Sequence, residues 1–277
     1  MAFTNLDDFV NKTSDFSKTQ HLHSFTSGCQ GGGGAGTIAT TAYKMYTDWI
    51  GNSTDGFGTY PGGTAETYSR TSNGSVLYNS PSAGKLTITH ATGSVAQQAH
   101  IGNFILCDRL CAVSGLSGVL STEQTFTLAP TRNTGGVGNV ISLEIAALIG
   151  ATATTVKAKY TNQDGVANRE TPLVAIGGTG DQAQTRAWIL PFFDGDTGVR
   201  SVESITLTGT TGTNGNIAVT IIRPLLIVPN NIMGAPANSM PLVDIPSDAC
   251  LFRLWTSSLA INLGFRFANT FFAVTEN

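Results

Sequence analysis

The chain has 277 residues, of which 15 are Lys or Arg and 18 are Asp or Glu, giving a formal net charge of −3. This length allows one large domain or two small ones, either of which buries about 70–75% of its unfolded surface on folding. Charged residues are only 12% of the chain, against about 25% in typical soluble proteins, and no run of bases marks a surface for nucleic acid or anionic lipid.

The chain begins with MAFTNLDDFVNKTSD, which places acids where a secretory signal has bases followed by an apolar run. No window of about 18 uninterrupted apolar residues follows, so we predict neither export nor a membrane partner. A protein made in a reducing compartment keeps its thiols free. We therefore expect free, buried cysteines at Cys29, Cys107, Cys111 and Cys250.

Residues 1–36 are predicted to form an N-terminal arm that ends in a glycine-rich joint, CQGGGGAG at 29–36. Phe3, Leu6 and Phe9 recur at helical spacing, which indicates a short amphipathic helix or an extended arm. The glycines of the joint have no Cβ, so they allow another backbone to approach closely.

The same glycines match the dinucleotide-binding pattern G-x-G-x-x-G at Gly31, Gly33 and Gly36. That site requires a buried strand before the glycines, a helix after them and an acid about 20 residues further on, at a strand end. The preceding HLHSFTSGC is too polar for such a strand, and Asp55 lies in the loop sequence NSTDGFG. We therefore predict no cofactor, and the lack of a Gly-Lys-Ser/Thr sequence excludes a phosphate-binding loop.

The segment that follows the joint, TIATTAYKMYTDWI at 37–50, has apolar residues at helical spacing and ends at Gly51. This pattern predicts a short helix, although the Thr and aromatic content also suits a strand. Residues 51–84 are rich in Gly, Pro, Asn and Ser, which predicts a long surface loop with room for one short strand. Loops of this length usually contact a partner.

From residue 85 onward, short apolar segments alternate with turn sequences, as in a β-rich domain. KLTITHATG, which begins at Lys85, alternates apolar residues with threonines, and the runs at 101–118 and 139–148 are predicted to be buried strands. The clearest hairpin is 154–176, which turns at Asn-Gln-Asp-Gly. One face of its first strand carries Val156, Ala158 and Tyr160.

RAWILPFF supplies a further strand, in which Pro191 suits an edge or a strand end. The segments 199–209 and 216–229 are predicted to form a second hairpin through the turn TGTNG. Ile205 falls out of phase with the preceding apolar residue, which predicts a β-bulge near Ser204. The last segment, 249–274, is dense in Phe, Leu and Trp and is predicted to supply closing strands.

At least eight short strands with turns about every 8–12 residues predict an all-β fold, either an antiparallel β-sandwich or a jelly roll. Helical signals are confined to the N-terminal fifth of the chain. We therefore expect the N-terminal arm with a short helical segment, followed by a single domain over 37–277 that includes the 51–84 loop.

Candidate metal sites are incomplete. His21 and His23 can lie on one face of a strand near Cys29, but no further carboxylate and histidine stand at suitable spacing. Cys107 and Cys111 have no second Cys or His pair to complete four zinc ligands. We predict solvent-facing histidines, structural cysteines and no bound metal.

Candidate catalytic sites are equally incomplete. Asp196-Thr-Gly matches the core of aspartic proteases, but one copy is present and a homodimer would have to supply the second. Asp194 and Asp196 can lend oxygens to calcium, though the rest of a calcium loop is missing. A turn between strands is the simpler interpretation. No G-x-S-x-G is present, so we predict a protein that is not an enzyme.

Four stretches of the sequence resemble segments of virion structural proteins of tailed bacteriophages, described as minor capsid, cement or decoration proteins. They are AGTIATTAYKMYTDW (35–49), DRLCAVSGLSG (108–118), YTNQDGVANRET (160–171) and VRSVESITLTGTTGTNGNIAVTIIRPL (199–225). The resemblance implies a β-sandwich or jelly roll on the exterior of an icosahedral capsid, made in the host cytoplasm. It also implies self-association, commonly as trimers, and the major capsid protein as a partner.

Two functions are consistent with these observations. The first is a non-enzymatic cement or decoration protein that stabilises the phage head by bridging capsomers. The alternative is a tail or head-fibre module that binds host-surface glycans through the 51–84 loop and its aromatics Phe57, Tyr60 and Tyr68. A major capsid protein is less consistent, because that fold needs a long charged helix.

Overall fold

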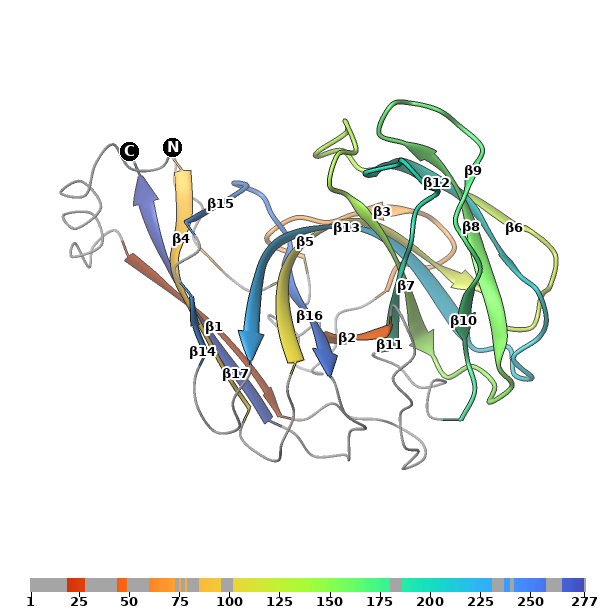
Figure 1. Ribbon diagram of the computed structural model, residues 1–277, viewed down its shortest axis with the longest axis horizontal. Helices are drawn as coiled ribbons and strands as arrows, with labels where there is room; N and C mark the ends of the chain where they lie inside the picture. The colour runs from red at the N-terminus through yellow and green to blue at the C-terminus, as the bar shows by residue number, and fades with distance from the viewer. Residues whose placement is uncertain are drawn as a thin grey trace.

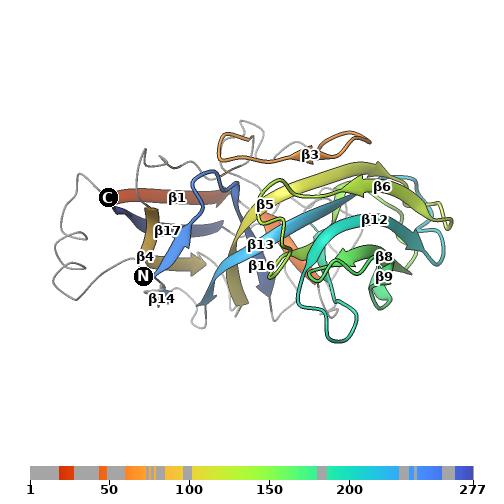
Figure 2. The same cartoon turned by 90° about the horizontal axis from the view of Figure 1, so that it is seen from above.

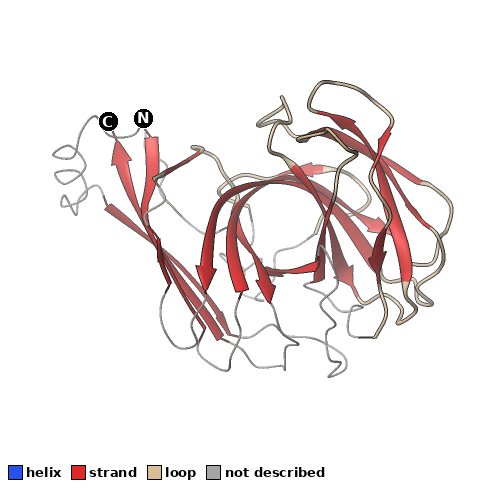
Figure 3. Ribbon diagram, viewed as in Figure 1, coloured by secondary structure: helices blue, strands red, loops and turns tan. Residues whose placement is uncertain are grey.

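The computed structural model describes residues 19–27, 44–48, 60–72, 75, 78, 85–95, 102–179, 186–230, 237–239, 242–257 and 266–276. All regular structure in these residues is β, in three sheets whose strand pairs are all antiparallel. The described residues contain no helix that could span a membrane. The prediction of an all-β antiparallel sandwich is confirmed (Figure 3).

The central sheet has seven strands in the order β13-β7-β11-β2-β16-β5-β3. Because β13 also pairs with β5, six of these strands form a closed ring, and the short strand β3 pairs with β5. The bounds are β2 Lys44–Asp48, β3 Glu66–Thr67, β5 Gly102–Leu116, β7 Val140–Ala147, β11 Arg186–Leu190, β13 Asn216–Asn230 and β16 Leu251–Ser257.

The outer sheet has the order β10-β8-β12-β6, with β9 also paired to β8. Its strands are β6 Gln124–Leu128, β8 Thr154–Asn162, β9 Arg169–Glu170, β10 Val174–Ile176 and β12 Val199–Leu207. Strand β8 alternates strictly between buried and half-buried residues, as predicted from its sequence. Its buried face includes Tyr160, which is fully inaccessible to solvent.

The main hydrophobic core lies between the ring and the outer sheet (Figure 1). The ring contributes alternate residues of β7, such as Leu143, and Trp188 from β11, whose side chain is fully buried. The outer sheet contributes Val156, Tyr160 and Val202. This core has the two-layer arrangement of a β-sandwich, which forms because each sheet has one apolar face to bury.

A second hydrophobic core lies on the opposite face of the ring strands, inside the ring. It includes Cys107 of β5, Ala187 of β11 and Phe252 of β16. Tyr68, from the segment 60–72 that carries β3, completes it. Figure 2 shows this segment running beside β5, and we call residues 60–72 the strap.

The side sheet combines both ends of the chain in the order β1-β17-β4-β14, with β15 paired to β4. Its strands are β1 Thr19–Ser27, β4 Lys85–Val95, β14 Ala237–Ser239, β15 Val243–Ile245 and β17 Arg266–Glu276. In Figure 1 it lies at the left, next to the long strand β13. The strand predicted to begin at Lys85 forms as β4, but Thr87 and Thr89 are buried together with Leu86 and Ile88.

Two predictions about local structure are wrong. Residues 44–48 form strand β2 instead of part of a helix, because the backbone there bonds to β11 on one side and β16 on the other and so closes the ring. The second predicted hairpin also does not form. Strand β12 pairs with β6 and β8 in the outer sheet, whereas β13 pairs with β5 and β7 in the ring. The chain crosses between layers there, so the two strands face each other across the core.

Other local predictions are confirmed. The first hairpin forms, with Lys159 opposite Glu170 and Tyr160 opposite Arg169. The register of β12 shifts between Val202 and Ser204, as a bulge requires. Pro191 directly follows the end of β11.

The predicted arm contains a strand, since β1 occupies residues 19–27 and pairs with β17 near the C-terminus. The helical pattern at Phe3, Leu6 and Phe9 and the glycine joint at 29–36 lie outside the described residues. The division of the chain into an arm over 1–36 and a domain over 37–277 stays a prediction.

Candidate functional site

The interior of the ring holds a charged pair in an apolar setting. Arg109 of β5 and Glu144 of β7 are both fully buried, and Arg109 Nη2 lies 2.9 Å from Glu144 Oε2. The same nitrogen donates a hydrogen bond to Thr220 Oγ1 of β13 at 3.0 Å. Loss of either partner would leave a buried charge without compensation, so each residue requires the other.

Three aromatic rings surround the Arg109 guanidinium, and two of them belong to the strap. Its central carbon lies 5.2 Å from the ring centre of Tyr60, 5.3 Å from that of Tyr68 and 5.5 Å from that of Phe252. Tyr60 also donates its hydroxyl hydrogen to Glu144 Oε2 at 2.7 Å. A guanidinium over a ring face is attracted by the ring quadrupole, by about 2 kcal/mol or more when desolvated. The strap is therefore bound to the ring interior through its two tyrosines.

The protonation states follow from these contacts. Burial alone lowers the pKa of Arg109, but the Glu144 carboxylate raises it, and the net pKa lies above its usual value. Burial also raises the pKa of Tyr68, which therefore stays protonated at neutral pH. Arg109 is therefore a stable cation and Tyr68 a neutral phenol, and neither is poised to exchange a proton near pH 7.

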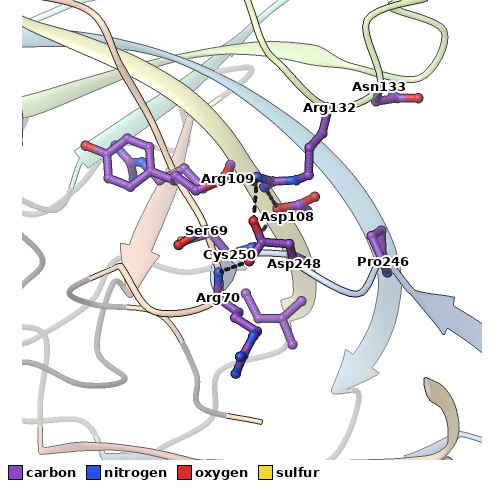
Figure 4. Close-up of polar contacts among 12 residues, drawn as sticks. Ser69, Arg70, Asp108, Arg109, Arg132, Asn133, Pro246, Asp248 and Cys250 are labelled. Atoms are coloured by element: carbon purple, nitrogen blue, oxygen red, sulfur yellow. Dashed lines mark hydrogen bonds and ion pairs between the residues drawn. The ribbon is translucent and has the colours of Figure 1, made fainter. Parts of the chain in front are cut away.

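A second ionic cluster centres on Asp108, the neighbour of Arg109 in β5 (Figure 4). Arg132 Nη2 lies 2.7 Å from Asp108 Oδ1 and donates a hydrogen bond to the Arg109 carbonyl oxygen at 3.3 Å. Arg132 Nη1 donates to the carbonyl oxygen of Tyr68 in the strap. Asp108 Oδ1 also accepts a hydrogen bond from the Cys250 backbone at 2.8 Å. Arg132 thus joins the connection after β6 to both β5 and the strap.

The rim of this cluster is more exposed. Asp248, which is 53% exposed, has Oδ2 at 4.0 Å from Arg132 Nη1 and accepts a hydrogen bond from the Arg70 backbone at 3.3 Å. Burial raises the pKa of Asp108, and the bond and charge of Arg132 oppose that rise. Among the described residues, the polar contacts of the two clusters join strands β5, β7 and β13 and the connection after β6 to the strap.

Burial suppresses the reactivity of the three cysteines that the structure describes. Cys107, Cys111 and Cys250 are free and buried, as predicted. Burial raises the pKa of Cys111 and of Cys250 to about 12, and that of Cys107 well above its usual value. Cys107 belongs to the core inside the ring and Cys111 to the sandwich core, so they do not form a ligand pair. Thiols in this state are poor nucleophiles and poor metal ligands.

Asp196 is held by side chains of the first hairpin. Its Oδ2 accepts a hydrogen bond from the Tyr160 hydroxyl and its Oδ1 one from Asn162 Nδ2, both at 2.6 Å. Arg169 Nε lies 3.5 Å away, and the Asp196 side chain is 3% exposed. Burial raises the pKa of Asp196, but the bonds from Tyr160 and Asn162 and the Arg169 charge outweigh it, so the net pKa is below its usual value. Asp194 is exposed in the same turn.

The remaining predicted positions are only partly placed. His21 and His23 lie on β1 opposite Phe272 and Thr270, and the structure describes their backbone alone. Cys29, Gly31, Gly33, Gly36, Asp55 and Phe57 lie outside the described residues. Within the described part of the chain, no three His, Cys, Asp or Glu side chains are grouped as metal ligands.

The two ionic clusters were not predicted from the sequence. The sequence does contain a signal for them, because Asp108 and Arg109 interrupt one apolar run and Glu144 interrupts another. Ionisable residues inside buried strands almost always have a partner. The spacing along the chain did not show that Glu144 and Arg132 were the partners, because each is supplied by a different strand or connection.

Comparison with known proteins gives weak structural neighbours. No protein-family model matches the chain, and no curated protein sequence does. A solved structure of infectious bursal disease virus, Gx strain, is 9% identical over 94% of this chain and 80% of that one, with a TM-score of 0.19. The VP2 subviral particle of the same virus is 8% identical over 93% of this chain and 80% of that one, with a TM-score of 0.20. TM-scores this low do not establish a common fold or a common function.

Proposed function

We propose that this chain is a non-enzymatic structural protein of a virus particle, specifically a cement or decoration protein of a tailed-phage head. In this role it lies on the capsid exterior, associates with the major capsid protein and with copies of itself, and bridges capsomers. It is made in the host cytoplasm and acts by burying surface. The support comes from the resemblance of four sequence stretches and from the all-β sandwich.

The proposal rests mainly on the bonding partners of the buried ionic groups. Arg109, Glu144, Asp108 and Asp196 are bonded to residues of the same chain that attach the strap or a turn. A catalytic acid or base must instead reach a proton on a bound substrate. These groups join parts of the fold in a protein whose low charge suits extensive contact with neighbours.

The alternative, a glycan-binding head-fibre or tail module, is less well supported. It relies on aromatic side chains of the 51–84 loop, but Tyr68 is only 6% exposed and Tyr60 is half-buried. Both rings lie against the Arg109 guanidinium, and that of Tyr68 is almost fully shielded from solvent. A sugar-binding platform needs an aromatic face that is open to the ligand.

The test is the copy number of the chain in purified particles, measured by quantitative mass spectrometry against the major shell protein. A cement or decoration protein will be present in hundreds of copies, because it repeats with the capsid lattice. A handful of copies per particle would support the fibre or tail alternative. Absence from washed particles would refute a virion role of either kind.

A further inference from the structure

Three described loop segments at one end of the sandwich contain no charged residue, although the exposed Glu123, which pairs with Lys159 of the outer sheet, directly follows the first of them. Residues 117–122, 148–153 and 208–215 follow β5, β7 and β12, and they meet at the lower right of Figure 1. None of these residues is Asp, Glu, Lys, Arg or His. We call the three ranges the uncharged end. Solvated loops normally carry charge, so this composition requires an explanation.

The uncharged end is a rigid unit. Thr211 binds the other two loops, since its amide donates to the Gly118 carbonyl at 2.9 Å and its carbonyl accepts from the Thr152 amide at 3.0 Å. Its Oγ1 accepts from the Gly150 amide at 3.1 Å. A Cβ on Gly150 would lie 1.7 Å from the Thr211 carbonyl oxygen, so the backbones are as close as glycine allows. Loops ordered in advance lose little entropy on binding.

Apolar side chains project from this rigid unit into solvent. Leu120 is 48% exposed, Leu148 is 47% exposed and Val119 is 36% exposed. The same three ranges also expose the hydroxyl and amide side chains of Ser121, Thr122, Thr152, Thr210, Thr213 and Asn214. Exposed apolar side chains combined with uncharged polar ones have the composition of a protein–protein interface core, where charged residues are depleted.

Other exposed parts of the sandwich differ in charge. The opposite end also exposes apolar residues, with Val137 at 62% and Phe193 at 49%, but Asp164, Asp194 and Arg200 are exposed beside them. The solvent face of the outer sheet carries the ion pairs Lys157–Glu170 and Lys159–Glu123, each at 2.8 Å. Covering those charges would cost desolvation energy, whereas covering the uncharged end costs far less.

We propose that the uncharged end is a self-association surface whose occupant is the same end of a second copy of this chain. Thr, Ser and Asn side chains both donate and accept hydrogen bonds, so a surface made of them can pair with an identical surface. It also meets its own copy without like-charge repulsion. Nucleic acid or an anionic membrane would require cations, and the three ranges contain none. The inference rests on the proposed function, in which copies of the chain lie close together.

Sedimentation velocity of the purified full chain over a concentration series tests the proposal. Leu148→Asp and Leu120→Asp, made separately, are each expected to raise the dissociation constant for self-association at least about tenfold, since both place like charges opposite each other. Leu148→Ser removes the apolar contact without a charge and is expected to act in the same direction, but less. Val137→Asp is the matched control at the charged end, with an expected change below about twofold.

The unfolding temperature of each variant is recorded alongside, and it is expected to stay at the wild-type value because these side chains are exposed. A wild-type chain that stays monomeric at every concentration would overturn the inference, as would a Val137→Asp variant that dissociates as readily as Leu148→Asp. A different result would refute the proposed function. A chain that self-associates through this end but is absent from purified particles would refute the virion role and leave the self-association surface intact.

Discussion

At the scale of single residues, the buried charges are explained by what they attach. Arg109 and Glu144 have no access to water, and they form an ion pair at 2.9 Å. Arg109 is also hydrogen-bonded to Thr220 of β13, and Glu144 to Tyr60 of the strap. Such a pair adds little to stability compared with an apolar pair of the same size, but replacing only one of the two residues is strongly destabilising. Its role is to define how the strap and the ring fit together.

Removing both partners of this pair should therefore cost less than the sum of the two single losses. Arg109→Met leaves Glu144 charged and buried, and we expect a loss of about 3–5 kcal/mol in the free energy of unfolding. Glu144→Gln should cost a similar amount for the converse reason. In urea titrations the double variant should lose clearly less than the sum of the two. Additive losses would show that the charges do not interact.

The second residue-scale prediction concerns Asp196 and pH. Its pKa is below the usual 3.8 in the folded protein, so the carboxylate contributes stability above that value. This contribution is fully present above about pH 5 and is lost as the pH falls through the folded-state pKa. At neutral pH the free energy of unfolding of Asp196→Asn should be lower than that of the wild-type protein. The difference between the two should become smaller as the pH falls. A gap that widens in acid would contradict the assignment.

Glycine 150 gives a residue-scale test of the uncharged end. In Gly150→Ala the new Cβ would lie 1.7 Å from the Thr211 carbonyl oxygen and 2.5 Å from the Thr213 amide nitrogen, both of them backbone atoms. We expect a loss of about 1–3 kcal/mol in thermal or urea unfolding. Gly135→Ala is the control, because nothing lies within 4 Å of its added Cβ. Equal losses in both variants would mean that the loops do not pack as described.

At the scale of elements, the strap is the part most dependent on long-range contacts. Its Tyr68 amide donates to the Leu110 carbonyl at 3.0 Å, and Arg132 holds the Tyr68 carbonyl and Asp108 together. Arg132→Ala should increase hydrogen exchange at the Tyr68 amide by roughly 10- to 100-fold, the equivalent of one lost charged hydrogen bond. The amides of β8 should be unaffected.

Arg200→Ala is the matched control for this experiment. Arg200 is exposed and donates through Nε to the Gln163 carbonyl at 2.9 Å, away from the strap. Exchange at Tyr68 should be the same in this variant as in wild type. Faster exchange in both variants would indicate a general loss of stability, and unchanged exchange in Arg132→Ala would remove Arg132 as the anchor.

The elements that could be predicted from the sequence are those whose partners are close along the chain. The first hairpin and the bulge near Ser204 follow from alternation and turn chemistry within a few residues. Strand β2 could not be predicted, because its partners β11 and β16 lie far along the chain and outweigh its helical spacing. The same applies to Arg109, whose partner Glu144 is 35 residues away.

At the scale of the whole molecule, charge is unevenly distributed. The outer sheet and one end of the sandwich carry ion pairs and exposed acids, whereas residues 117–122, 148–153 and 208–215 at the other end carry none. This distribution fits the proposed function, in which one surface contacts neighbouring proteins and another contacts solvent.

Under the proposed function, this chain is a repeated structural component of a virus shell. Cryo-electron microscopy of intact purified particles tests it most directly. We expect density for the β-sandwich at symmetry-related positions over the head, with its outer sheet towards solvent and contacts to the major shell protein. Particles whose head shows no such density, or in which the chain occupies only the tail, would contradict the account.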